Sequence, residues 1–291
     1  MNPRVFLNYN IYRAIFTVYP IPLILACGLV FTSACGESDL SFPSTVGATL
    51  WIFSLVSTNT GYPFLGLLCA ILTGLTVGFI NGILVTKLKL SSLVITLGMN
   101  FLLRGLINIG TSGQGISLVF LNKSFFYKMF VGRIGEFPLQ MLWGFVFVVI
   151  CLFLFNRHQF GAHICFVGDN RVSAAETGIK VDRVKIGAFM LIGFASAIAG
   201  ILSGLINNTF WPTAGDSYLL TTMAAVYLGG TPYLGWGRYC YRRRHWGFYP
   251  QLPGNRHHFH RPHRVLYPVF LRPHYYFSPY KPQIFQYETE R

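Results

Sequence analysis

Apolar residues in this chain of 291 residues come in blocks long enough to cross a bilayer. A bilayer core of about 30 Å needs roughly 20 apolar residues per helix. Charged residues make up only 11% of the chain, whereas a soluble protein has about a quarter. Lipid cannot satisfy open backbone groups, so the blocks are expected to be helices. The predicted fold class is an all-α polytopic membrane protein with about seven spans, at residues 14–34, 42–58, 63–86, 92–110, 139–156, 186–207 and 217–235.

Two of these spans are predicted to be irregular. Pro43 interrupts the second span, and the acidic residues Glu37 and Asp39 flank it. The last span is short and is broken by glycines at 229–230 and by Pro232. Proline and glycine interrupt regular helices, because proline lacks an N–H group and glycine loses more conformational entropy than other residues.

Lysine and arginine in the short loops predict the orientation in the membrane. Basic residues concentrate in cytoplasmic loops, so the loops after the third and fifth spans are expected inside the cell. The loop 111–138 is then outside, although it also carries basic residues. Counting back through the spans places the N-terminus outside, and a missing leading helix would correct that. The residues behind this assignment are Lys87, Lys89, Arg157, Arg171, Lys180, Arg183 and Lys185 inside, and Lys123, Lys128 and Arg133 outside.

Glycines recur every four residues in two of the spans. Gly74, Gly78 and Gly82 lie on one face of the third span, and Gly200 and Gly204 repeat the spacing in the sixth. Small residues at this spacing let a neighbouring helix pack closely in a membrane. These five glycines are therefore predicted to be helix-packing positions in a protein with several spans.

Polar residues inside otherwise apolar spans are candidates for a substrate pathway. Thr96, Asn100 and Arg104 are four residues apart and therefore share one helix face. Asn81 is a further polar position in the third span. The alternative is hydrogen bonding between helices, with Arg104 reaching the outer interface. Asp39 and Ser41 are added as pathway candidates, because ionisable groups at membrane depth usually face a cavity or a partner.

The most specific stretch is residues 166–201, where a polar loop runs into a span rich in glycine and alanine. Its pattern resembles the permease subunit of bacterial monosaccharide ABC importers, of the ribose type. The resemblance implies that this loop contains a short coupling helix that docks into an ATPase, with two small alanines entering a groove. An ordinary cytoplasmic loop is the alternative. The matching residues are Gly168, Asn170, Ala174, Ala175, Glu176, Gly178 and Ile179.

Three other segments resemble the same family. The run G-E-S-D-L-S at 36–41 is similar to the family's G-G-I-D-L-S-V-G element, which lies at a broken helix near the translocation path. Here Ser38 replaces the apolar residue. The run at 97–105 matches L-G-x-x-x-x-L-R-G, and that at 224–231 also follows the family. For residues 36–41, the alternative is a loop that dips toward the cytoplasmic interface.

The resemblance implies a transport subunit rather than an enzyme. It would move a ribose-like monosaccharide across the bacterial inner membrane as a multi-pass protein. The expected partners are an ABC ATPase, a second permease copy, a periplasmic sugar-binding protein and membrane lipid, with no nucleic acid. The sequence contains no G-x-x-x-x-G-K-[ST] phosphate loop, so ATP is expected on the ATPase. No metal or other cofactor is expected in this chain.

Two alternative functions stay open at this point. The first is a secondary carrier driven by an ion gradient, which would need an ionisable relay within the spans. Its candidates are Glu37, Asp39 and Arg104. The second is a non-functional, degenerate product of a sugar permease, since the family pattern extends only over residues 4–238.

Residues 238–291 do not follow the family pattern. They contain ten Lys and Arg against two Glu, are rich in His, Tyr and Pro, and contain no 18-residue apolar run. They could bind anionic lipid or nucleic acid, or bind a metal through the histidines between 257 and 263. The favoured interpretation is a frameshift near residue 238 that leaves this segment out of frame and disordered. The expected division is thus an incomplete permease domain, 1–237, followed by this tail.

Overall fold

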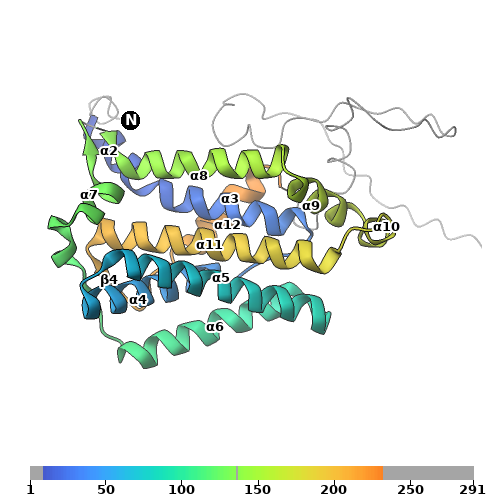
Figure 1. The fold of residues 1–291 in the computed structure, drawn as a ribbon, viewed down its shortest axis with the longest axis horizontal. Helices are drawn as coiled ribbons and strands as arrows, with labels where there is room; N and C mark the ends of the chain where they lie inside the picture. Colours follow the sequence, from blue (N-terminus) through green and yellow to red (C-terminus); the bar gives the residue numbers. More distant parts are fainter. Residues whose placement is uncertain (1–8, 136, 232–291) are drawn as a thin grey trace, which may run out of the picture.

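The computed structural model describes residues 9–135 and 137–231, which form a bundle of helices lying mainly along one direction (Figure 1). The tail 238–291 and its proposed frameshift lie outside the described residues. Between these helices, the described residues form only four strands of two residues each. The helices are α2 (Tyr9–Val18), α3 (Pro20–Ala34), α4 (Phe42–Thr60), α5 (Pro63–Leu88), α6 (Ser92–Thr111), the 3-10 helix η1 (Val119–Lys123), α7 (Phe125–Val131), α8 (Leu139–Asn156), α9 (Gln159–Asp169), α10 (Arg171–Glu176), α11 (Val181–Asn207) and α12 (Tyr218–Leu228).

Four helices of the described chain are long and apolar enough to cross a membrane: α5, α6, α8 and α11. α2 and α3 meet at a bend of 43° and together could form a fifth span. This confirms the predicted all-α polytopic class. The count of seven is not confirmed, because α4 and the 11-residue α12 do not meet the same criteria. The last four residues of the seventh predicted span lie outside the described part of the chain.

Helix α11 is the centre of the bundle. It packs against α3, α4 and α5, and 72% of its most apolar window is buried. α6 lies at one edge of the bundle and α8 at the other (Figure 1), and only 17% and 22% of their windows are buried. The central helix therefore has protein on most of its surface, whereas α6 and α8 keep wide apolar faces outside.

The five glycines singled out in the sequence lie at close helix crossings. A Cβ atom on Gly78 would come within 3.0 Å of the backbone oxygen of Phe189 on α11. On the other side of α11, a Cβ atom on Gly200 would lie 2.7 Å from the backbone oxygen of Val46 on α4. Gly74 and Gly82 likewise meet α11, and Gly204 meets α4. These approaches allow α11 to fit between two neighbouring helices.

The interruption between the first two predicted spans is a buried, non-helical segment at residues 35–41. α3 ends at Ala34, and α4 begins at Phe42 with Pro43 in its first turn. The prediction that Pro43 interrupts a span is therefore wrong. Proline suits the first turn of a helix, where its missing N–H would have no intrahelical partner. The break precedes Pro43 and is called the α3–α4 break below.

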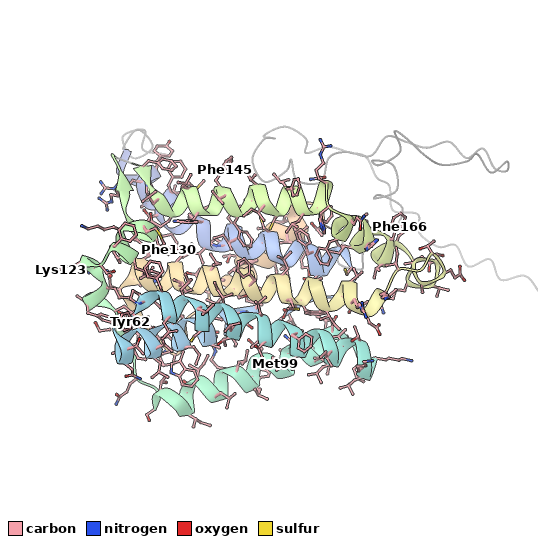
Figure 2. The ribbon with its side chains drawn as sticks, viewed as in Figure 1. Tyr62, Met99, Lys123, Phe130, Phe145 and Phe166 are labelled. Atoms are coloured by element: carbon pink, nitrogen blue, oxygen red, sulfur yellow. The ribbon has the colours of Figure 1, made fainter. Side chains whose placement is uncertain are left out.

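The two ends of the bundle carry different elements. α9 and α10 lie at one end, and α7 and β4 lie at the opposite end (Figure 1). At the α7 end, β1 (Ile116–Ser117) pairs with β4 (Thr209–Phe210), and β2 (Arg133–Ile134) pairs with β3 (Phe137–Pro138), both antiparallel. Figure 2 shows Lys123 at this end and Phe166 near the other. The loops predicted to be cytoplasmic and external are thus at opposite ends.

Candidate functional site

The backbone of the α3–α4 break is held by side chains of α6. The N–H of Ser38 donates to Ser92 Oγ at 3.0 Å, and the N–H of Leu40 donates to Thr96 Oγ1 at 3.0 Å. Both α6 side chains are buried. Non-helical backbone inside a membrane protein needs such partners, because lipid offers none. The two hydrogen bonds from α6 therefore stabilise the non-helical backbone of the α3–α4 break.

Within the break, Asp39 and Ser41 form a small buried network with α5. Asp39 Oδ1 accepts hydrogen bonds from the N–H and from the hydroxyl of Ser41, both at 2.7 Å. The Asn81 amide donates to Ser41 Oγ at 2.8 Å. All three side chains are at most 2% exposed. Asn81 Oδ1 has no hydrogen-bond partner among the described residues, so the network has one unused acceptor, on its α5 side.

The polar face of α6 continues toward the opposite end of the bundle. Asn100 Oδ1 accepts a hydrogen bond from the Ser44 hydroxyl on α4. One turn further, Arg104 donates to the backbone oxygens of Pro212 and Ala214 and forms an ion pair with Asp216. The face thus joins α6 to α4 and to the loop between α11 and α12. Its role as a sugar pathway stays a prediction.

Arg104 bonds to protein groups of this loop. Its side chain is 17% exposed, and Asp216 is 56% exposed. The carbonyl groups of the loop have no helical partners, so a guanidinium with several donors suits this position. Arg104 thus anchors the loop between β4 and α12 over the α7 end of the bundle.

Glu37 forms ion pairs with two cations. Its Oε1 accepts from Arg171 on α10 and from Lys185 on α11, each at 2.6 Å. Lys185 is predicted to lie in a loop, but α11 begins at Val181 and buries this side chain. The three acidic and basic candidates for a carrier relay do not meet one another. Glu37, Asp39 and Arg104 each bond to different partners, in the described chain.

A cavity of about 540 Å³ opens beside this contact. It lies between the α3–α4 break, the end of α5, the start of α6 and the α10–α11 region. Its wall includes both polar and apolar side chains, and both signs of charge. The lining residues are Gly36, Glu37, Ser38, Val85, Thr86, Lys89, Leu90, Ser91, Ser92, Leu93, Arg171, Val181, Asp182 and Lys185. Ser38 and Ser92 place this cavity directly next to the polar network of the break.

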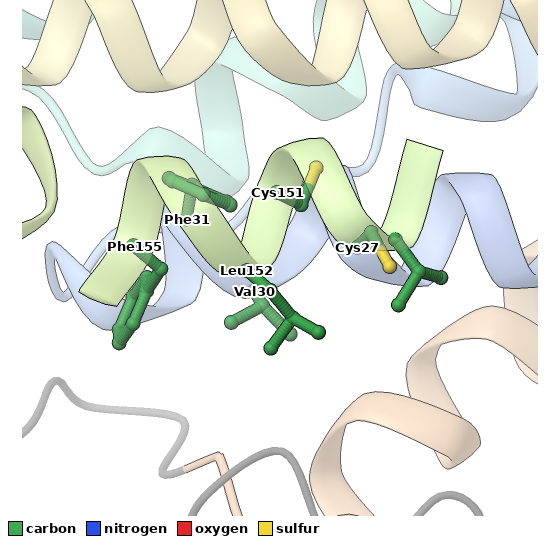
Figure 3. A pocket seen from close by; sticks show the side chains of 7 residues that line it. Cys27, Val30, Phe31, Cys151, Leu152 and Phe155 are labelled. Carbon is green, nitrogen blue, oxygen red and sulfur yellow. The ribbon is translucent and has the colours of Figure 1, made fainter. Parts of the chain in front are cut away.

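A second cavity, between α3 and α8, has a different character (Figure 3). It measures only about 10 Å³ and is lined by five apolar side chains and the thiols of Cys27 and Cys151. A space this small and apolar is a packing gap, because even one water needs about this volume and several polar partners. Among the described residues, no three His, Cys, Asp or Glu side chains lie close enough together to hold a metal.

The predicted coupling loop folds into two helices, α9 and α10, at the α9–α10 end of the bundle. The Asn170 side chain caps α10 by accepting from the N–H groups of Val172 and Ser173, at 2.9 and 3.2 Å. Asparagine is a favoured residue at this position for that reason. After α10, Gly178 takes a positive φ of 83°, which glycine adopts without steric cost.

The two alanines of the coupling loop face different ways. Ala174 is 3% exposed and packs against its own chain, whereas Ala175 is exposed. The expectation that both alanines enter a groove of a partner is therefore wrong for Ala174. Neighbouring residues of a helix point about 100° apart, so Ala174 faces the protein while Ala175 faces outward. Val172 is 67% exposed and adds an apolar side chain to the outer face.

The other residues of the loop lie around this outer face. Glu176 ends α10 and is exposed, whereas Gly168 in α9 and Ile179 after α10 are half-buried. Phe166 on α9 is 39% exposed. The surface formed by Val172, Ala175 and Glu176 is called the α10 surface below.

Comparison with known proteins identifies the family. The family described as "Branched-chain amino acid transport system / permease component" matches residues 11–239. The chain belongs to this permease family. The match covers α2 to α12, including the α3–α4 break and the coupling loop. A permease component is a transport subunit and not an enzyme, as the sequence predicts.

The most similar relatives that were found are sugar permeases. The chain is 30% identical to the ribose import permease protein RbsC of Haemophilus influenzae, over 81% of this chain and 73% of the relative. It is 32% identical to RbsC of Bacillus subtilis, over 73% and 66%. It is 29% identical to the L-arabinose ABC transporter permease protein AraH of Azospirillum brasilense, over 72% and 61%. No solved structure matches the chain.

These matches confirm the resemblance to ribose-type permeases. They also support the expected location, a multi-pass protein of the bacterial inner membrane, as do the four membrane-length helices. The roles of the individual site residues stay predictions. The sequence did not single out Ser44, Ser92, Lys185 or Asp216 as site residues, although Ser92 continues the spacing of four residues on α6.

Proposed function

We propose that this chain is the membrane-spanning subunit of an ABC importer that carries a monosaccharide across the inner membrane. The observation that carries the proposal is the similarity to ribose and arabinose permeases over 72–81% of this chain. The permease itself makes and breaks no covalent bond. A monosaccharide carries several hydroxyl groups, and the donors and acceptors along α6, which bond to protein groups in this structure, would exchange those bonds for bonds to the sugar.

A permease of this kind works in general with an ATPase and a binding protein. We propose that the α10 surface docks into the ATPase, which binds the ATP that this chain is not expected to bind. In support, Val172 and Ala175 lie exposed at the end of the bundle that the basic residues assign to the cytoplasm. Movement of α10 can open or close the transport route only if it shifts part of the bundle between two stable arrangements.

We also propose that the wide apolar faces of α6 and α8 contact membrane lipid and a second permease copy. Only about a fifth of each of these helices is buried within the chain, at 17% and 22% of their apolar windows. Residues such as Phe101 on α6 and Phe145 on α8 are 67% and 61% exposed. Figure 2 shows Phe145 on the outer side of α8.

Uptake into vesicles tests the proposed function. The chain would be reconstituted into proteoliposomes with its ATPase, and labelled ribose and arabinose would be supplied with a binding protein outside. ATP enclosed in the vesicles is expected to drive accumulation of one of these sugars. Accumulation driven by an ion gradient without ATP would instead indicate a secondary carrier. No uptake with all partners present would support the non-functional alternative.

A further inference from the structure

One buried carboxylate joins three separate elements of the chain. Glu37 lies in the α3–α4 break, Arg171 is the first residue of α10, and Lys185 lies in α11. Both cations reach the same oxygen, Oε1 of Glu37, at 2.6 Å. Hydrogen bonds between charged partners are shorter and stronger than neutral ones, with usual N–H···O lengths of about 2.7–2.9 Å, and both contacts at 2.6 Å are slightly shorter than that. The contact is therefore a firm connection between the coupling loop and the break.

One of the two cations is enough to balance the negative charge of Glu37. The side chains of Glu37 and Lys185 are each 7% exposed, so they neutralise each other inside the protein. Arg171 is 55% exposed and would be solvated without Glu37. Burying charged groups has a desolvation cost that well-packed apolar residues avoid. The stability of the fold alone thus does not explain the ion pair with Arg171. The effect of this pair is to connect α10 to the α3–α4 break.

The connection continues from Glu37 into the polar network. The next residue, Ser38, donates its N–H to Ser92 at the start of α6, and Asp39 follows in the network with Ser41. A shift of Arg171 therefore acts on backbone that is held by only a few side-chain hydrogen bonds. In the G-G-I-D-L-S pattern that residues 36–41 resemble, a glycine stands where this chain has Glu37.

The same contact forms part of the wall of the 540 Å³ cavity. Glu37, Arg171 and Lys185 all line it, together with Ser38 and Ser92. Any movement of α10 that pulls on Glu37 must alter this wall. The cavity is at the predicted cytoplasmic end of the bundle, where a transported molecule would leave.

We propose that Glu37 and Arg171 act as positioning residues that transmit movement of α10 to the α3–α4 break and to the cavity beside it. Lys185 pairs with the buried carboxylate and holds it in place. The pair couples events at the ATPase to the shape of the transport route. This inference rests on the proposed function as an ATP-driven permease.

A double-mutant cycle tests the pair in the complete transporter. The variants are Glu37→Gln, Arg171→Gln and the two together, with Lys180→Gln as control, because Lys180 is an exposed cation of the same loop. The measured quantity is sugar accumulated per ATP hydrolysed in proteoliposomes. Each single variant is expected to lower this ratio about fivefold or more, the lower limit of typical coupling effects. The double variant should lower it no further than Glu37→Gln alone, because Glu37→Gln already removes the ion pair that the Arg171 change would remove.

Several outcomes would overturn the proposal. Unchanged ratios in both single variants would do so, as would losses that multiply in the double variant. A third is an Arg171→Gln effect that Glu37→Gln does not share, together with less ATPase recovered on purification. That result would make Arg171 a docking contact, since Glu37 is buried and cannot reach a partner. A merely structural role would lower the unfolding temperature of Glu37→Gln without changing the ratio.

A readout that needs no transport keeps this inference separate from the proposed function. In the full chain in detergent, amide hydrogen exchange of residues 171–176 is measured for Glu37→Gln and for the unchanged protein. Faster exchange in the variant is expected, because α10 loses its tie to the break. Equal exchange would overturn the connection even if the protein transports sugar. Faster exchange in a protein that transports no sugar would refute the proposed function alone.

Discussion

The substitution Thr96→Val tests whether α6 supports the α3–α4 break. Valine has nearly the shape of threonine but cannot accept the hydrogen bond from the N–H of Leu40, which is 3.0 Å from Thr96 Oγ1. The hydroxyl also donates to the Ser92 carbonyl at 2.7 Å, but a helical carbonyl keeps its backbone partner. The main loss is therefore one acceptor for one backbone N–H group, beside a long contact of 3.5 Å between the hydroxyl and the Ser38 carbonyl.

The expected destabilisation is about 1–2 kcal/mol. A buried N–H left without a partner costs about 1–3 kcal/mol, whereas side-chain hydrogen bonds between membrane helices average about 0.6 kcal/mol. The larger range applies better, because Leu40 lies in a non-helical segment and cannot regain an intrahelical bond. Leu40 is half-buried, which argues for the lower part of that range.

Unfolding in mixed detergent micelles measures this difference. The matched control is Thr73→Val on α5, where the hydroxyl donates only to the Cys69 carbonyl of the same helix, at 2.8 Å. Thr96→Val is expected to lower the ratio of folded to unfolded protein by about 5- to 30-fold relative to the control. If the two variants unfold with the same free energy within about 0.5 kcal/mol, α6 does not hold the break as described.

Three further perturbations follow from the packing and the charged contacts. Gly78→Ala should destabilise the protein by about 1–3 kcal/mol, because the added methyl group overpacks against α11. Gly98→Ala, with open space around it, should be neutral or stabilising. Unfolding curves compare the two variants, and equal shifts would contradict the close crossing of α5 and α11. Arg104→Gln should increase protease cleavage in the loop 208–217 more than Asp216→Asn does. A half-exposed ion pair contributes only about 0–1 kcal/mol, whereas Arg104 also binds two backbone carbonyls of the loop. Equal cleavage of the two variants would refute this order. Ala175→Asp should reduce copurification of the ATPase without changing the unfolding temperature, and unchanged copurification would count against the α10 surface.

The sequence predicts the long spans well, because block length and flanking prolines limit where a helix can lie. Residues 139–156 were predicted and α8 covers Leu139–Asn156; residues 92–110 were predicted and α6 covers Ser92–Thr111. The bend of 43° before Pro20 was not predicted, although Pro20 itself is the signal. Pro43 was misread for the opposite reason, since a proline near the start of a helix looks the same in sequence as one that breaks it.

The site is predicted only in part, because its partners are distant in the chain. Spacing by four residues places Thr96, Asn100 and Arg104 on one face of α6, and the structure places them there. Which groups they meet depends on tertiary packing, and Arg104 binds carbonyls more than 100 residues away. Lys185 was assigned to a loop because a lysine suggests solvent. Its burial depends on Glu37, 148 residues earlier, and no local pattern shows that partnership.

The two-sided packing of α11 restricts how the length of this helix can vary. Gly193 faces α5, and Gly200 and Gly204 face α4, at fixed angles around one axis. Inserting a single residue between them would rotate everything beyond it by about 100° and turn both later glycines away from α4. Deleting one residue would rotate the segment as far in the other sense. Single-residue insertions and deletions are therefore tolerable only beyond the ends of α11, because any change within it breaks its contact with α4 or with α5.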